Sequence, residues 1–271
     1  LGVSAILNIA WDLLFVAVFH WGIAGAAYAT IFAQYVSGIG ILLYVLFRCR
    51  SLFPERKDLC FDGGILKEIA GLSSLTCLQQ SVMNFGILMV QGLVNSFGAT
   101  TMAAFAAAVK IDTFAYLPVQ DFGNAYSTFI AQNYGAGNKE RIRRGTKESF
   151  AISTAFSLVI SALVFAFAAP LMQIFVSSAE TAVIASGVRY LRIEGAFYFG
   201  IGCLFLLYGY YRAIKRAEMS VVLTVISLGI RVLLAYVLSA TFLGETGIWM
   251  AIPIGWMLAD LTGLLYMRKT W

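Results

Sequence analysis

The feature that most constrains this chain is a series of eight apolar runs separated by short polar connections. The runs cover residues 1–19, 23–47, 72–97, 101–133, 150–175, 182–211, 221–242 and 248–267. A helix needs about 20 apolar residues to cross the hydrocarbon core of a bilayer. Since 60% of the 271 residues are hydrophobic and 12% are charged, with a mean hydropathy of +0.82, the pattern predicts an all-α polytopic membrane protein with eight transmembrane helices.

Positive charge is confined to alternate ends of these runs. The segments that follow the second, fourth, sixth and eighth runs hold 15 lysines and arginines, and the other four connections hold none. Cytoplasmic loops of membrane proteins carry the excess of these residues. We therefore expect a multi-pass protein of the cell membrane with both ends of this chain in the cytoplasm. The net charge of +5 then reflects topology, so we expect a lipid bilayer and no nucleic acid as partner.

The fourth run, residues 101–133, breaks the apolar pattern. It holds Lys110 and Asp112 within its apolar stretch and Pro118 a few residues later. A charge in hydrocarbon costs at least about 2.5 to 3.5 kcal/mol on the insertion scale, so such residues face a bundle interior or a watery cavity. We expect this helix to line a path and Pro118 to bend or loosen it, because proline removes one backbone hydrogen bond.

Other polar side chains within the runs are spaced so that they share helix faces. Residues four apart lie on one face of a helix, which groups Gln80 with Asn84, and Glu194 with Tyr198. We take the polar residues of the third, fourth and sixth runs as candidates for binding a substrate or a cation. They are Gln80, Asn84, Lys110, Asp112, Tyr116, Gln120, Asp121, Glu194 and Tyr198. The alternative is that the intramembrane charges pair across helices and only hold the bundle together.

Motifs of enzymatic chemistry are absent from the sequence. It has no Walker A loop, no H-E-x-x-H zinc motif and no nucleophile elbow. The four cysteines do not have metal-binding spacing. We expect no enzyme activity, no metal and no cofactor.

Two features predict that the chain contains parts of two helix bundles. In the longest connection, residues 51–71, Asp62 can cap a short helix that begins at Gly63 and suits the membrane interface. This connection is either a linker between two bundles or an ordinary amphipathic loop. In addition, G-I-A-G-A-A-Y-A from Gly22 resembles G-E-T-G-I-W-M-A from Gly244. The first two runs would then correspond to the last two, which predicts a repeat of six spans, of which the first copy is incomplete here. The start at Leu1, without Met, also suggests a fragment.

Several stretches together resemble a known family. They are N-I-A-W-D-L-L-F-V, G-I-A-G-A-A-Y-A-T, G-L-S-S-L-T-C-L-Q-Q-S-V-M-N-F-G, A-A-F-A-A-A-V-K-I-D-T-F-A-Y-L-P-V-Q-D-F-G-N-A, Q-N-Y-G-A-G-N and G-I-W-M-A-I-P-I-G-W. In this order and spacing they resemble the multidrug and toxic compound extrusion (MATE) transporters over nearly the whole chain.

This resemblance implies a twelve-helix, two-lobe antiporter that exports organic cations or drugs by alternating access against an inward flow of Na⁺ or H⁺. Residues 1–50 would be the last two helices of the N-lobe, residues 51–71 the cytoplasmic interlobe linker, and residues 72–271 the six-helix C-lobe, in a monomer. Some members carry an acid in the first C-lobe helix, where this chain has Gln80 or Ser81, and another in the fourth, where the nearest acid is Glu194. A related lipid-linked oligosaccharide flippase, or a receptor or channel that transports nothing, are the alternatives.

Overall fold

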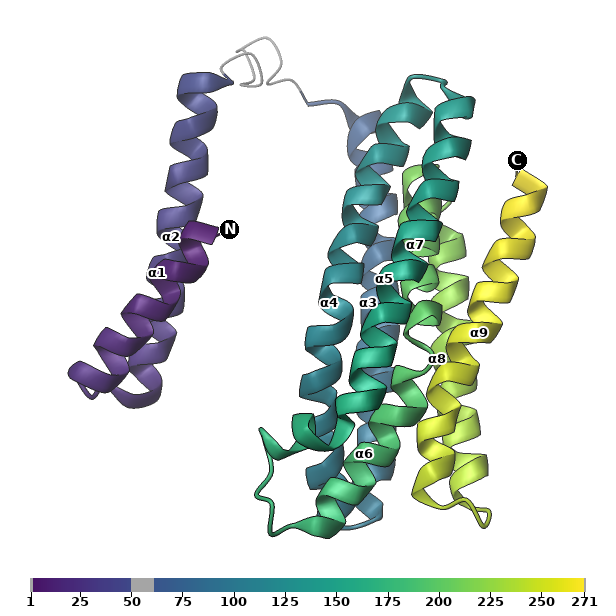
Figure 1. Cartoon of the computed structure of the whole chain (residues 1–271). Coiled ribbons are helices and arrows are strands. Elements are labelled where there is room, and N and C mark those ends of the chain that lie inside the picture. Colours follow the sequence, from purple (N-terminus) through teal and green to yellow (C-terminus); the bar gives the residue numbers. More distant parts are fainter. Residues whose placement is uncertain (1, 50–60, 271) are drawn as a thin grey trace. The chain divides into compact units, whose positions relative to one another are not determined.

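The computed structural model describes residues 2–49 and 61–270, and every regular element in that part of the chain is a helix. The chain divides into two compact units, Leu1–Gly64 and Ile65–Trp271, whose helices are labelled in Figure 1. The division falls within residues 51–71, the predicted linker, of which residues 51–60 lie outside the described part.

The first unit is a helical hairpin. It consists of α1 (Gly2–Asp12), a π-helical turn η1 (Leu13–Val18) and α2 (Gly22–Arg48). The buried face of α2 carries Gly25, Ala29 and Ala33, and such small residues let membrane helices approach closely. The Ser4 hydroxyl donates to the carbonyl oxygen of Ala33 at 3.2 Å, which fixes the pairing of the two helices.

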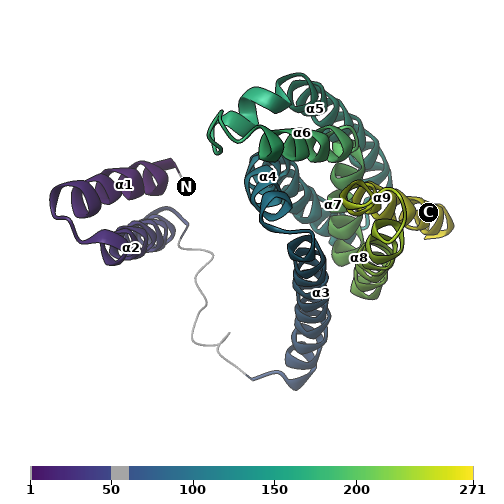
Figure 2. The same ribbon diagram turned by 90° about the horizontal axis from the view of Figure 1, so that it is seen from below.

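The second unit is a bundle of seven helical segments. Their bounds are α3 (Gly63–Ser96), α4 (Ala99–Gly135), α5 (Lys139–Gln173), α6 (Thr181–Gly195), α7 (Tyr198–Ala213), α8 (Ala217–Ser239) and α9 (Glu245–Thr270). Figure 2 shows α4 to α9 grouped together, with α3 at the edge of that group. A stripe of Gly86, Val90 and Val94 forms the buried face of α3, where a Cβ on Gly86 would lie 3.2 Å from Leu228 of α8.

The number of spans differs from the eight predicted. Among the described residues, six helices are long and apolar enough to cross a membrane: α2, α3, α4, α5, α8 and α9. The segments α6 and α7 make a seventh span if they count as one, and they meet at a bend of 52°. The first predicted span, residues 1–19, corresponds to the shorter apolar helix Gly2–Val18, which is not among those six.

The start of α3 lies inside the predicted linker. The Asp62 carboxylate accepts a hydrogen bond from the Gly64 backbone N–H at 2.7 Å, as a helix N-cap does. The sequence predicted a short interfacial helix here. Instead, the helix that begins at Gly63 continues as α3 into the third predicted span. Lys215, between α7 and α8, donates to Glu68 of α3 at 2.5 Å, and this hydrogen bond raises the pKa of Lys215.

Two helices of this unit, α4 and α5, contain a proline that bears on the predicted bend. Helix α4 is assigned as one helix through Pro118, so a bend there remains a prediction. Non-helical backbone angles occur instead in α5, at Phe167 (φ −103°, ψ 17°), three residues before Pro170. This is the position that the ring of Pro170 disturbs, because proline crowds the preceding turn and disfavours helical geometry there.

Candidate functional site

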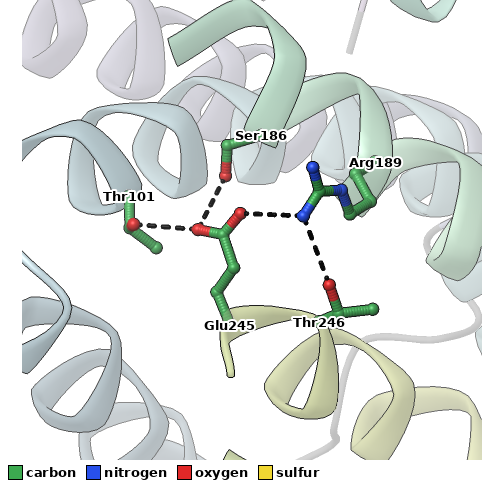
Figure 3. A network of polar contacts seen from close by, with 5 residues as sticks. All are labelled: Thr101, Ser186, Arg189, Glu245 and Thr246. Atoms are coloured by element: carbon green, nitrogen blue, oxygen red, sulfur yellow. Dashed lines mark hydrogen bonds and ion pairs between the residues drawn. The ribbon is translucent and has the colours of Figure 1, made fainter. Parts of the chain in front are cut away.

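A polar network holds three helices together at the end of the bundle where α4 and α9 begin (Figure 3). The Glu245 carboxylate, in the first turn of α9, accepts hydrogen bonds from Thr101 of α4 at 2.8 Å and from Ser186 of α6 at 3.1 Å. Its other oxygen pairs with Arg189 at 3.4 Å, and Arg189 also donates to the hydroxyl of Thr246 at 3.4 Å. The network therefore fixes the relative positions of α4, α6 and α9 at this end.

An aromatic layer lies one helical turn deeper on the same three helices. Phe105, Tyr190 and Trp249 each follow a network residue by four positions, and residues at this spacing share a helix face. The Phe105 and Trp249 rings stack with their centroids 5.6 Å apart. Tyr190 meets the edge of Trp249 at 4.9 Å. Since all three side chains are buried, they close the bundle between the polar network and its interior.

Next to this layer lies a group of five residues that we call the interior acid cluster, with Tyr190 belonging to both: Asp112, Tyr190, Glu194, Tyr198 and Arg231. Tyr198 donates its hydroxyl hydrogen to Oδ1 of Asp112. Glu194, Tyr190 and Arg231 also act electrostatically on Asp112. Asp112 is 3% exposed and Glu194 is 6% exposed, so the carboxylates face the inside of the bundle and not its surface.

A break in a helix places two of these residues. Glu194 lies in the last turn of α6 and Tyr198 is the first residue of α7, with the 52° bend between the two segments. The sequence predicted one continuous span over residues 182–211, which the structure corrects. The turn closes through short-range backbone bonds, from Phe197 N–H to the carbonyl of Glu194 at 2.9 Å and from Gly200 N–H to that of Phe197 at 2.8 Å. Discontinuous helices of this kind form ion sites in transporters.

The charges of the interior acid cluster do not balance. It contains two carboxyl groups and one guanidinium group, that of Arg231. In the part of the chain that the structure describes, Oδ2 of Asp112, Oε2 of Glu194 and Nε of Arg231 are buried without a hydrogen-bond partner. With both carboxyl groups ionised, the cluster would hold one uncompensated negative charge in a bundle interior, which is costly. A proton or a small monovalent cation would remove that cost.

The structure brings together three of the nine predicted residues. Asp112, Glu194 and Tyr198 meet in the interior acid cluster. Tyr116 and Gln120 of α4 are half-buried and do not belong to it. The remaining four, on faces of α3 and α4 that this unit leaves exposed, are Gln80, Asn84, Lys110 and Asp121.

Lys110 does not neutralise Asp112. Its ammonium group lies over the ring of Phe175, 5.9 Å from the centroid, and the Lys110 side chain is exposed.

Pro118 lines a cavity of about 160 Å³ between α4 and α5, together with Val119, Phe122, Ile152, Ser153 and Phe156. This cavity is small and mostly apolar, and the predicted path along α4 stays a prediction.

Two members of the interior acid cluster were not among the predicted site residues. Arg231 is a charge in the middle of the apolar run 221–242, and Tyr190 lies four residues before Glu194. A residue four positions from an intramembrane acid shares its face, and a charge in a span seeks a partner. Both signals were present in the sequence, but they do not reveal which helices are neighbours.

Comparison with known proteins places these features in a family. The model of the family described as MatE matches residues 75–237. "Probable multidrug resistance protein YpnP" of Bacillus subtilis is 30% identical over 268 residues, 98% of this chain and 59% of that protein. "Probable multidrug resistance protein NorM" of Thermotoga maritima is 28% identical over 243 residues, 89% of this chain and 50% of that protein. The chain thus spans about half to three-fifths of the length of these curated relatives.

Other matches agree in fold. A "FAD transporter" of Shewanella oneidensis is 25% identical over 263 residues, 93% of this chain and 56% of that protein. A solved structure described as "Outward-facing conformation of a multidrug resistance MATE family transporter of the MOP superfamily" is similar with a TM-score of 0.92 and 25% identity, over 99% of this chain and 60% of that chain. Since the family model covers more than half of the sequence and the helices follow the same fold, the chain belongs to the MatE family of multidrug and toxic compound extrusion transporters.

Proposed function

We propose that this chain is part of a cation-coupled antiporter that exports organic cations or drugs by alternating access between two lobes. Family membership supports transport, and two relatives are named as probable multidrug resistance proteins. Residues 1–50 would be the last two helices of the N-lobe, residues 51–71 would link the lobes, and residues 72–271 would form the C-lobe of a monomer. The bias of lysine and arginine toward alternate connections supports a position in the cell membrane with both ends of the chain cytoplasmic.

The observation that carries this proposal is the interior acid cluster at the break between α6 and α7. Asp112 and Glu194 offer two carboxyl groups against the single guanidinium of Arg231. Coupling requires a group that binds H⁺ or Na⁺ in one conformation of the protein and releases it in another. The ion must therefore have different affinities for the two conformations, because a ligand shifts a conformational equilibrium only by that difference. The broken helix supplies an element that can change the surroundings of the carboxylates.

Burial supports separate sites for the ion and for the drug. The carboxyl groups of Asp112 and Glu194 are nearly inaccessible, so a bulky organic cation cannot reach them, whereas a proton or Na⁺ can. From the sequence alone, Asp112 is a candidate for binding either a substrate or a cation. We propose instead that the ion binds inside the bundle and that the drug binds at exposed polar residues such as Gln80, Asn84 and Asp121. The two ligands then compete through the conformations that they favour.

An anionic substrate is the second candidate. One relative is named a FAD transporter, and the exposed ammonium group of Lys110 would suit an anion. A lipid-linked oligosaccharide flippase, which the sequence leaves open as an alternative, would also bind an anionic group. The receptor or channel alternative is disfavoured by the family match.

Transport by the full-length protein in proteoliposomes tests the proposal. A cationic dye and FAD would each be supplied under an imposed H⁺ gradient, an imposed Na⁺ gradient or neither, with protein-free liposomes as control. We expect dye movement that depends on one of the two gradients and stops when an ionophore collapses it. Gradient-independent movement of dye would contradict coupling. Movement of FAD without dye would contradict the organic-cation substrate.

A further inference from the structure

A third buried carboxyl group lies outside the interior acid cluster. Asp260, in α9, is 6% exposed. Its Oδ1 is buried without a hydrogen-bond partner among the residues that the structure describes. Its Oδ2 lies 3.5 Å from the place that a Cβ on Gly200 would take, and the side chains of Trp256 and Met257 pack beside the same glycine. All of these residues belong to the second unit, so the burial of Asp260 arises within one helix bundle.

The surroundings of Asp260 contain no compensating charge in the described part of the bundle. The titratable groups that face it from α7 are Cys203 and Tyr208, and neither carries positive charge. From α8, Arg231 acts on Asp112 and Glu194, whereas burial is the one influence on Asp260. An isolated carboxylate in such a medium is strongly disfavoured and neutralises instead.

The side chains around Asp260 favour a proton over a metal cation as its ligand. A metal cation requires several oxygen atoms around it, but among the neighbours Gly200, Cys203, Tyr208, Trp256 and Met257 only Tyr208 carries a side-chain oxygen. A proton requires only the carboxylate itself. Protonation forms one O–H bond on Asp260, and transfer of that proton to water restores the carboxylate, with nothing oxidised or reduced.

We propose that Asp260 is a second proton-carrying site of this protein, separate from the interior acid cluster. Its carboxyl group lies against the first turn of α7, directly after the break from α6. A shift of α7 relative to α9 would therefore change the exposure of Asp260 to water and with it the binding of the proton. The use of this proton in coupling rests on the proposed antiport, whereas the site itself can be tested without transport.

Infrared difference spectroscopy of the purified full-length protein tests the site. Spectra recorded at acidic minus alkaline pH detect the C=O stretching band of each carboxylic acid that titrates. We expect a band that is lost in Asp260→Asn and retained in Asp112→Asn, in Glu194→Gln and in the exposed control Glu140→Gln. If Asp260→Asn does not fold, Asp260→Glu provides the assignment, because it keeps the acid and shifts the band.

The outcomes separate this inference from the proposed function. A spectrum of Asp260→Asn, or of Asp260→Glu, identical to that of the wild type would overturn the proton site, including the case of an acid that stays permanently protonated. A band assigned to Asp260 in a protein that moves no substrate supports the site and contradicts the antiport. Proton-driven transport lost in Asp260→Asn, together with loss of the band, supports both.

Discussion

At the scale of single residues, the contact between Tyr198 and Asp112 defines the interior acid cluster most directly. The Tyr198 hydroxyl donates to Oδ1 of Asp112 inside the bundle. A hydrogen bond to a charged group contributes about 1.5 to 3 kcal/mol, and removing one partner leaves the other unsatisfied. We predict that Tyr198→Phe lowers the free energy of unfolding of the full-length protein by about 1 to 3 kcal/mol and slows transport.

Thermal unfolding of the purified protein, with Tyr116→Phe as the matched control, measures this effect. Tyr116 lies in the same part of the bundle, but its ring contacts Phe205, with centroids 6.3 Å apart, and it does not belong to the cluster. Tyr116→Phe should unfold close to the wild type. Equal unfolding midpoints for both variants would show that the bond to Asp112 contributes nothing.

Residue patterns predicted part of this site. Spacing by four grouped Glu194 with Tyr198 on the assumption of a continuous helix, whereas the two residues meet Asp112 from opposite sides of the break between α6 and α7. The same rule grouped Gln80 with Asn84, yet this pair is exposed while the adjacent Gln79 is buried. Periodicity shows which residues share a face. In a membrane protein it does not show which face points inward, because lipid-facing and core-facing surfaces are both apolar.

At the scale of helices, close backbone contact holds α8 against α9. A Cβ on Gly255 would lie 2.3 Å from the carbonyl oxygen of Ser227 and 3.3 Å from the Cβ of Arg231. Because the first of these neighbours is backbone, the helices would have to separate. Overpacking of this kind costs about 1 to 3 kcal/mol. We predict that Gly255→Ala destabilises the full-length protein by this amount and displaces Arg231 from the interior acid cluster.

Gly229 of α8 offers a matched control, since a Cβ there would meet nothing within 4 Å. Gly229→Ala should leave stability unchanged or raise it by up to about 1 kcal/mol, because alanine favours helix more than glycine does. Chemical denaturation of both variants measures the difference. A loss of stability in Gly229→Ala as large as that in Gly255→Ala would refute close packing as the cause.

Helix existence was easier to predict than helix interruption. The apolar runs located every long helix, because about 20 apolar residues suffice to span a bilayer. The break between α6 and α7 was missed, since Gly195 and Ala196 are common within membrane helices and no proline marks the site. Pro118, by contrast, lies within a helix assigned without interruption. Neighbouring groups can satisfy the carbonyl that a proline leaves free, so sequence alone does not locate a break.

At the scale of the whole molecule, the positions of the buried polar groups show which candidate sites lie within this chain and which functions would need the rest of a longer relative. The acid cluster, the aromatic layer and Asp260 are all enclosed within Ile65–Trp271. A small ion site can therefore be complete in this unit. The chain covers 59% of the length of its Bacillus subtilis relative, and the proposed alternating access between two lobes would also require the remainder of such a protein.

The measurement that tests the central claim is gradient-driven export of a cationic dye by full-length protein carrying Asp112→Asn or Glu194→Gln. Each change removes a charge with little change in shape. We predict that either variant folds and that its initial rate, normalised to folded protein, falls about tenfold or more, equivalent to about 1.4 kcal/mol, while the control Glu140→Gln, at an exposed residue of α5 outside both proposed sites, keeps at least half of the wild-type rate. Wild-type rates in well-folded Asp112→Asn and Glu194→Gln, under both H⁺ and Na⁺ gradients, would contradict a coupling role for the interior acid cluster.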